Sequence, residues 1–170
     1  MTQVYQLAPL SSTGHWSFIV LLVILIGLGV FIYLKNMPKV SKAVAIGVLL
    51  PMVLAFSWMF YKVNDAELII SGDTVTLDVP FYGFSLPRTE VELAKVERVD
   101  WSQTPELKPD LRVNGVGMPG FQLGWFRLAN EQKAFVATTS NDNLVLLPTT
   151  RNYPLILSLE NPETLIKIAP

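Results

Sequence analysis

The chain contains no cysteine and a single histidine, two side chains on which enzymes often rely as nucleophile or general base. Without cysteine there are no disulfides, no thiolate metal sites and no cysteine nucleophiles. The one histidine, His15, directly precedes an apolar run and has no candidate partner beside it, so we interpret it as a residue at a membrane surface rather than a catalytic base. The sequence predicts no enzyme, no bound metal and no cofactor.

Acidic residues are absent from the first 64 positions, and all 14 lie between Asp65 and Glu163. Nine of the 13 basic residues lie in residues 64–170, which contain all 14 acidic ones and therefore carry a formal charge of 9 − 14 = −5. Nucleic acids and anionic lipid surfaces attract clustered lysine and arginine. We expect this acidic region to bind no nucleic acid.

Two runs without any charged residue, 16–34 and 43–61, dominate the first third of the chain. A helix of about 19 residues spans roughly the 30 Å hydrocarbon core of a bilayer. We predict two transmembrane helices in a hairpin, preceded by an N-terminal tail over residues 1–15. A buried core helix is the alternative, although soluble helices of this length normally keep a polar face. Ala43 and Gly47 have the spacing of a close contact between helices.

The connection between the two runs carries Lys35, Lys39 and Lys42, whereas a single basic residue, Lys62, directly follows the second run. The positive-inside rule places the loop with more lysines in the cytoplasm. Both termini are then expected on the outer side of the membrane. Neither run contains an ionisable residue, which argues against a transporter or channel.

The remainder of the chain, residues 64–170, has the short alternating segments and polar turns of an antiparallel β domain. Thr74 to Val79 alternates cleanly, and the turn before it predicts a hairpin with residues 66–70. Asn161 to Glu163 has the features of a helix start. We predict a sandwich or barrel of about seven strands with a C-terminal helix. The other expected strands are 84–86, 96–101, 121–128, 133–139, 144–147 and 153–157.

Residues 111–128 combine a glycine-rich turn with an aromatic strand. The glycine spacing matches neither the dinucleotide fingerprint nor the P-loop. We interpret it as a structural turn that lets the next strand enter the sheet, with a phosphate-binding loop as the alternative. If the loop binds a ligand, Arg112, Asn114 and the amides of Gly115 and Gly117 are the expected groups. The whole candidate binding or structural motif comprises Arg112, Asn114, Gly115, Gly117, Pro119, Gly120, Trp125 and Phe126.

Trp125 and Phe126 point to opposite faces of their predicted strand, because successive side chains alternate. If one face packs in the core, the other is a candidate partner surface. The carboxylates offer possible acid–base pairs, which we interpret instead as solvated faces of strands and turns. These carboxylates are Asp73, Asp78, Glu90, Glu92 and Glu97.

Strands followed by one helix are also the order of a pleckstrin-homology-like (PH-like) domain. The segments 112–120, 124–127, 133–136 and 155–158 resemble the bacterial PH domain families. The resemblance covers about residues 66–170 and implies a PH-like fold, a setting beside transmembrane helices, and a binding or scaffolding role. Eukaryotic PH domains bind phosphoinositides through a basic first hairpin loop, but the corresponding turn here, 71–74, contains no lysine or arginine.

The sequence therefore predicts a protein anchored in the bilayer of the bacterial cytoplasmic membrane by two helices. Its PH-like domain is expected to dock a protein partner or to self-associate. The alternative is a lipid or small-ligand binding domain that uses the barrel mouth and the glycine-rich loop.

Overall fold

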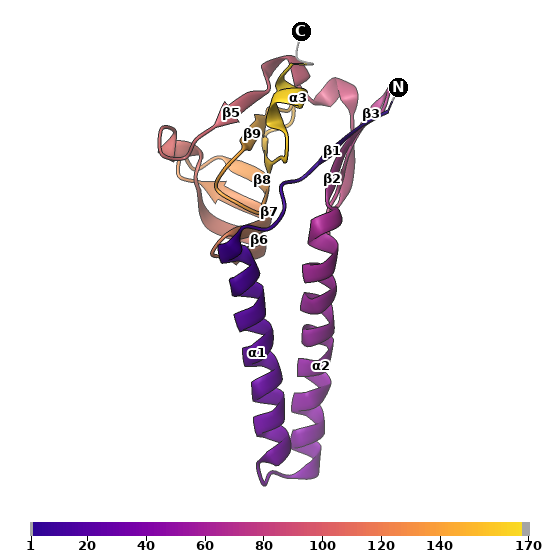
Figure 1. The fold of residues 1–170 in the computed structure, drawn as a ribbon, viewed down its shortest axis with the longest axis vertical. Coiled ribbons are helices and arrows are strands. Elements are labelled where there is room, and N and C mark those ends of the chain that lie inside the picture. The colour runs from indigo at the N-terminus through magenta and orange to yellow at the C-terminus, as the bar shows by residue number, and fades with distance from the viewer. Residues whose placement is uncertain (1, 168–170) are drawn as a thin grey trace.

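Two long helices project side by side from a β domain in the computed structural model, which describes residues 2–167 (Figure 1). They are α1 (Ser12–Leu34) and α2 (Lys39–Lys62), and both are long and apolar enough to cross a membrane. Each begins four residues before the charge-free run that predicted it, because a helix can start with polar residues. Ser11 caps α1 by accepting a hydrogen bond from the Gly14 amide at 3.1 Å.

The prediction that the two helices are in close contact at Ala43 and Gly47 is wrong. Both residues are exposed, and a Cβ added to Gly47 would meet no atom within 4 Å. The two helices instead line an apolar groove with larger side chains, which include Leu25 of α1 and Leu49 of α2. The helical hairpin is thus held by bulky apolar residues and not by close approach of the backbones.

The β domain is a sandwich of two sheets. The first is antiparallel, in the order β1-β2-β3-β4, and the second has the order β5-β9-β10-β8-β7-β6. The first sheet contains β1 (Gln3–Gln6), β2 (Glu67–Ile70), β3 (Thr74–Asp78) and β4 (Phe84–Pro87). The second contains β5 (Glu97–Val99), β6 (Pro109–Met118), β7 (Phe121–Leu128), β8 (Lys133–Thr138), β9 (Leu144–Leu147) and β10 (Leu155–Ser158).

The predicted mainly β, PH-like architecture is confirmed, with more strands than expected. The described residues form ten strands, and β8 and β10 pair in parallel although the sequence predicted only antiparallel pairs. A helix, α3 (Pro162–Ile166), follows the last strand as predicted, and Leu165 packs in the core. Short 3₁₀ turns complete the chain: η1 (Val63–Asp65), η2 (Arg88–Glu90), η3 (Leu93–Lys95) and η4 (Pro105–Leu107). Residues 168–170, the end of the predicted domain, lie outside the described residues.

Residues 3–11, part of the N-terminal tail predicted over residues 1–15, are hydrogen-bonded to the β domain. β1 pairs with β2 of the first sheet. Just after β1, the Ala8 amide donates to the Ser158 carbonyl at 2.9 Å, at the end of β10 in the second sheet. The N-terminal segment therefore bonds to both sheets and closes one side of the sandwich.

The domain-side ends of both helices are built into the core of the sandwich. Phe18 of α1 and Met59 of α2 are almost fully buried, and both belong to the same cluster as Leu68 and Phe121 of the two sheets. The Phe18 and Phe121 rings lie 5.0 Å apart. Since helix ends and sheets share one apolar core, the domain and the helical hairpin form one packed body.

Candidate functional site

The glycine-rich segment lies in the hairpin of β6 and β7. The sequence predicted a turn there, but the structure continues β6 through Met118 and leaves only Pro119 and Gly120 between the strands. Propensity misled the prediction, because glycine and proline are uncommon in strands. Most of the candidate motif is consequently an extended strand rather than a loop.

Gly115 and Gly124 lie directly opposite each other in this hairpin. A Cβ on Gly115 would lie 2.3 Å from the Leu123 carbonyl oxygen, and a Cβ on Gly124 would lie 2.4 Å from the Asn114 carbonyl oxygen. No side chain fits in either place. The two glycines are thus required for close approach of the two backbones.

The turn at Pro119 and Gly120 is packed against the start of α1. The Ser17 hydroxyl donates to the Pro119 carbonyl at 2.9 Å, and the Ser11 hydroxyl donates to the Gly120 carbonyl at 3.5 Å. This part of the motif connects the second sheet to a helix. Its polar backbone groups face α1 and not an open phosphate-binding cavity.

Arg112 and Asn114 are both exposed, but they do not converge on one position. Arg112 lies opposite Phe126 and Asn114 lies opposite Trp125, two neighbours that point to opposite faces of β7. Asn114 accepts a hydrogen bond from the Tyr82 hydroxyl at 3.3 Å. The structure therefore does not bring together the pair of side chains that the sequence suggested for a ligand.

Phe126 is buried and does not provide the aromatic partner surface that alternation suggested. It packs in a second apolar cluster with Val99 and Ile156, on the outer face of the six-stranded sheet. Trp101 and Leu107 cover this cluster. The expectation fails because the segment after β5 folds back over the sheet, so both sheet faces are covered.

Trp125 is half-buried at the rim of the main core. Its ring lies 4.7 Å from the Tyr153 ring and 5.2 Å from the Phe135 ring, edge to face in both cases. The Lys133 ammonium lies 4.6 Å from the centre of the Trp125 ring. This residue contributes packing and a cation–π contact within the domain.

The exposed part of the motif is the outer edge of β6. This ten-residue strand ends the six-stranded sheet, and among the described residues no strand pairs with its outer side. Leu111 and Val113 are 54% and 52% exposed there. Two register shifts interrupt its pairing with β7, and such bulges are a common feature of edges that avoid uncontrolled pairing.

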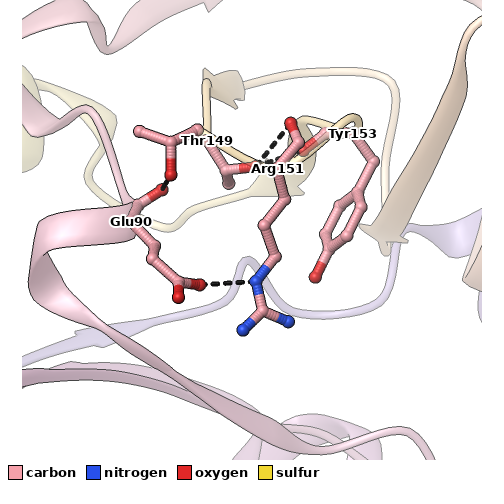
Figure 2. A network of polar contacts seen from close by, with 5 residues as sticks. Glu90, Thr149, Arg151 and Tyr153 are labelled. Atoms are coloured by element: carbon pink, nitrogen blue, oxygen red, sulfur yellow. Dashed lines mark hydrogen bonds and ion pairs between the residues drawn. The ribbon is translucent and has the colours of Figure 1, made fainter.

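Two of the candidate carboxylates form ion pairs instead of acid–base pairs. Glu92 binds Lys95 at 2.8 Å, and Glu90 binds the Arg151 Nε at 2.5 Å (Figure 2). The Glu90 hydrogen bond is the main cause that raises the pKa of Arg151 above its ordinary value. Beside it, the Thr149 hydroxyl donates to the Tyr153 carbonyl at 2.5 Å (Figure 2). The Glu90–Arg151 pair joins η2 to the loop between β9 and β10, and the Thr149 contact lies within that loop.

The turn between β2 and β3 gains a basic residue that local sequence did not show. Arg88 donates its amide to the Asp73 carbonyl at 2.8 Å, and a shallow pocket there is lined by Gly72, Asp73, Arg88 and Thr89. β2 starts next to the end of α2 and leads away from the helices (Figure 1). The turn therefore lies at the end of the sheet remote from the helical hairpin.

Metal-binding geometry is also absent from residues 2–167, where no three His, Asp or Glu side chains are grouped to hold an ion. A groove between β1 and α3 is lined mainly by polar residues, including Gln6, Glu160 and Thr164. It contains no charge cluster or nucleophile that defines a reaction.

A family model described as "Bacterial PH domain" matches residues 66–168. The match begins where α2 and η1 end, so it covers β2 to α3 and leaves out β1. No curated protein and no solved structure matches the chain. PH domains are generally non-catalytic binding modules.

Proposed function

Because the chain belongs to the bacterial PH domain family, we propose that it is a non-enzymatic binding module held in the bacterial cytoplasmic membrane by α1 and α2. The support for the membrane setting is the pair of helices, whose apolar side chains are exposed along most of their length. In water such a surface would be strongly unfavourable, whereas lipid tails solvate it.

The proposed orientation puts the lysine-rich connection of the helices in the cytoplasm and the PH-like domain outside. Lys35, Lys39 and Lys42 support it through the positive-inside rule. β1 pairs with β2, so the N-terminus and the domain lie on the same side whichever way the hairpin is inserted.

The binding surface that we propose is the free edge of β6, on which a protein partner or a second copy of the chain adds a strand. The single observation that supports it is a ten-residue edge strand that exposes Leu111 and Val113. Strand addition supplies main-chain hydrogen bonds, and exposed apolar side chains supply specificity. The bulges in β6 restrict pairing to a strand of matching register.

Crosslinking from β6 tests this function. A photoreactive benzoylphenylalanine replaces Val113 in the full chain in living cells, and adducts are resolved by mass. We expect a discrete protein adduct that is lost when Leu111→Lys is added, because a charge on the edge disfavours apolar docking. The matched control places the probe at Val4, which is 50% exposed on the edge strand β1.

A second copy is distinguished from another protein by a single-cysteine variant, since the chain has no cysteine of its own. Val113→Cys gives a disulfide-linked dimer under mild oxidation if two β6 edges meet, and Val4→Cys does not. Equal adducts from positions 113 and 4, or none from 113 in a folded protein, would reject β6 as the docking edge.

Ligand binding at the glycine-rich loop is the competing function. Gly115 and Gly120 are in contact with neighbouring backbone, and Arg112 and Asn114 face different ways, which does not favour it. The double variant Arg112→Ala and Asn114→Ala is expected to leave the β6 adduct in place. Its loss, with the fold intact, would favour the competing function.

A further inference from the structure

Phe81, in the connection between β3 and β4, has a backbone and an environment that are both unfavourable for phenylalanine. Its φ is 62°, in the left-handed region that favours glycine or asparagine, and its side chain is 60% exposed. Neither local conformation nor burial in the domain explains a large apolar ring at this position. Departures of this kind concentrate at functional sites.

The neighbouring residues hold the connection in place while its tip stays exposed. Val79 and Pro80 on one side are buried, and the Tyr82 amide donates to the Pro80 carbonyl at 2.8 Å. The Tyr82 hydroxyl reaches Asn114 of β6. Phe81 is thus fixed in its exposed position by contacts on both sides.

The Phe81 ring contacts α2. It lies 4.9 Å from the Trp58 ring at an interplanar angle of 62°, an edge-to-face pair. Trp58 lies about one helical turn before α2 ends at Lys62, and it is itself 47% exposed. Two partly exposed aromatic rings therefore meet at the end of a segment that is apolar enough to span a bilayer.

We propose that Phe81 and Trp58 together occupy the boundary between head groups and acyl chains of the membrane. Phe81 then attaches the PH-like domain to the membrane surface, in addition to the attachment by α1 and α2. The occupant of this surface is phospholipid. The argument is continuity, because Phe81 extends the lipid-facing surface of α2 onto the domain, and the interface is where aromatic rings gather in membrane proteins. The inference rests on the proposed insertion of the helices.

Lipid contact at residue 81 can be measured in vesicles. The variant Phe81→Cys, unique because the chain has no cysteine, is labelled with the environment-sensitive dye NBD and reconstituted in phosphatidylcholine and phosphatidylglycerol. Lipids with a spin label at carbon 5 or carbon 12 then quench the dye. Glu131→Cys is the matched control, because Glu131 is also exposed with a positive φ of 66° but lies in the turn between β7 and β8. Leu28→Cys, exposed on α1, reports insertion of the helices.

We expect the dye at 81 to be quenched at least twofold more by the carbon-5 than by the carbon-12 lipid, and the dye at 131 to be unaffected. The dye at 28 should respond more to the carbon-12 lipid. If position 28 is quenched and position 81 behaves like 131, the membrane proposal stands and the Phe81 inference is wrong. If position 28 is not quenched, both are wrong.

A second measurement leaves Phe81 unchanged. Vesicles carrying a phospholipid with a photoreactive diazirine near the head group are irradiated with the unmodified chain, and crosslinked peptides are identified by mass spectrometry. We expect lipid adducts on the peptide that contains residues 79–83 and none on the peptide that contains 129–133. The reverse distribution, or adducts on the helices alone, would overturn the inference.

Discussion

Gly14 of α1 and Gly120 of the β6–β7 turn are in direct backbone contact. A Cβ on Gly120 would lie 2.6 Å from the Gly14 amide nitrogen, and a Cβ on Gly14 would lie 2.9 Å from the Gly120 carbonyl oxygen. These residues, 106 positions apart in the sequence, mark the place where a helix start meets the second sheet. Their lack of side chains allows the helix and the sheet to share one core.

Substitution at this contact should separate the helix from the domain. For Gly120→Ala we expect the free energy of unfolding to fall by at least about 2 kcal/mol, because the residue has a φ of 74° and the added methyl would lie 2.6 Å from the backbone nitrogen of Gly14. This corresponds to a decrease in Tm of roughly 4–8 °C for a chain of this size. Near-UV circular dichroism in detergent micelles measures the transition.

The control for that variant is Gly47→Ala in α2, where the new Cβ meets no atom within 4 Å. Its Tm should stay the same or rise slightly, since alanine is the better helix former. Equal decreases for the two variants would show that the contact with α1 does not matter to stability.

The N-terminal segment is held by a small buried network around Thr139. The Thr139 hydroxyl donates to the Ala8 carbonyl and lies 2.9 Å from the Ser158 hydroxyl, which also accepts from the Thr139 amide. Thr139→Val keeps the shape but removes the donor to the Ala8 carbonyl, and it leaves the Ser158 hydroxyl with only the amide of residue 139 as a partner. We expect the free energy of unfolding to fall by about 1–3 kcal/mol. Amide hydrogen exchange of β1 should accelerate, and mass spectrometry of peptides from residues 2–8 measures it.

Thr139→Ser retains the hydroxyl and is the matched variant for this network. It should exchange in β1 almost as slowly as the wild type. If both variants accelerate exchange equally, the hydroxyl is not what holds the N-terminal segment, and packing around residue 139 is responsible.

The sequence predicted the elements whose pattern is local. The alternation of Thr74 to Val79 and the length of the two apolar runs were sufficient to identify β3 and both helices. β1 was missed because Tyr5 and Leu7 are too few to show a period, and the strand depends on pairing with β2, some 60 residues later. The burial of Phe126 depends likewise on the distant segment that covers it.

The candidate site was harder to predict than the fold, because its properties depend on contacts between residues that are distant in the sequence. Glycine density indicated close approach of backbones, but the partners, Gly14 for Gly120 and Gly124 for Gly115, are visible only in three dimensions. The exposed position and positive φ of Phe81 have no local signal. A phenylalanine between proline and tyrosine in the sequence looks like an ordinary core residue.

The turn after β5 supplies a prediction on pH. Asp100 accepts hydrogen bonds from the Ser102 hydroxyl and amide, at 2.6 and 2.8 Å, and these lower its pKa, the hydroxyl more than the amide. A carboxyl with a lowered pKa stabilises the fold at pH values above its unfolded pKa. That contribution is lost as the pH falls through the folded value. Ser102→Ala removes the larger cause, so the Asp100 pKa should rise toward its ordinary value without passing it.

The Asp100 titration is measured by the carboxyl carbon shift in NMR spectra of labelled protein in nanodiscs. Ser85→Ala, which removes an exposed hydroxyl from β4, should leave the Asp100 titration unchanged. An unchanged Asp100 pKa in Ser102→Ala would mean that the hydroxyl contact is not maintained in solution.

The orientation of the helical hairpin decides on which side of the membrane partners are sought, and the lysines of the hairpin predict that orientation. With the lysine-rich connection in the cytoplasm, alkaline phosphatase fused after Pro170 should be active and a fluorescent protein that matures only in the cytoplasm should be dark. Replacing Lys35, Lys39 and Lys42 with glutamine removes the charge difference and leaves Lys62, so a fraction of the molecules should invert. Inversion would appear as a fall in phosphatase activity per molecule and a gain in fluorescence.

The control is Lys95→Gln, which removes a lysine far from the helices in the sequence and should change neither reporter. An inactive phosphatase fusion on the unsubstituted chain would place the PH-like domain in the cytoplasm and expose the β6 edge to cytosolic proteins.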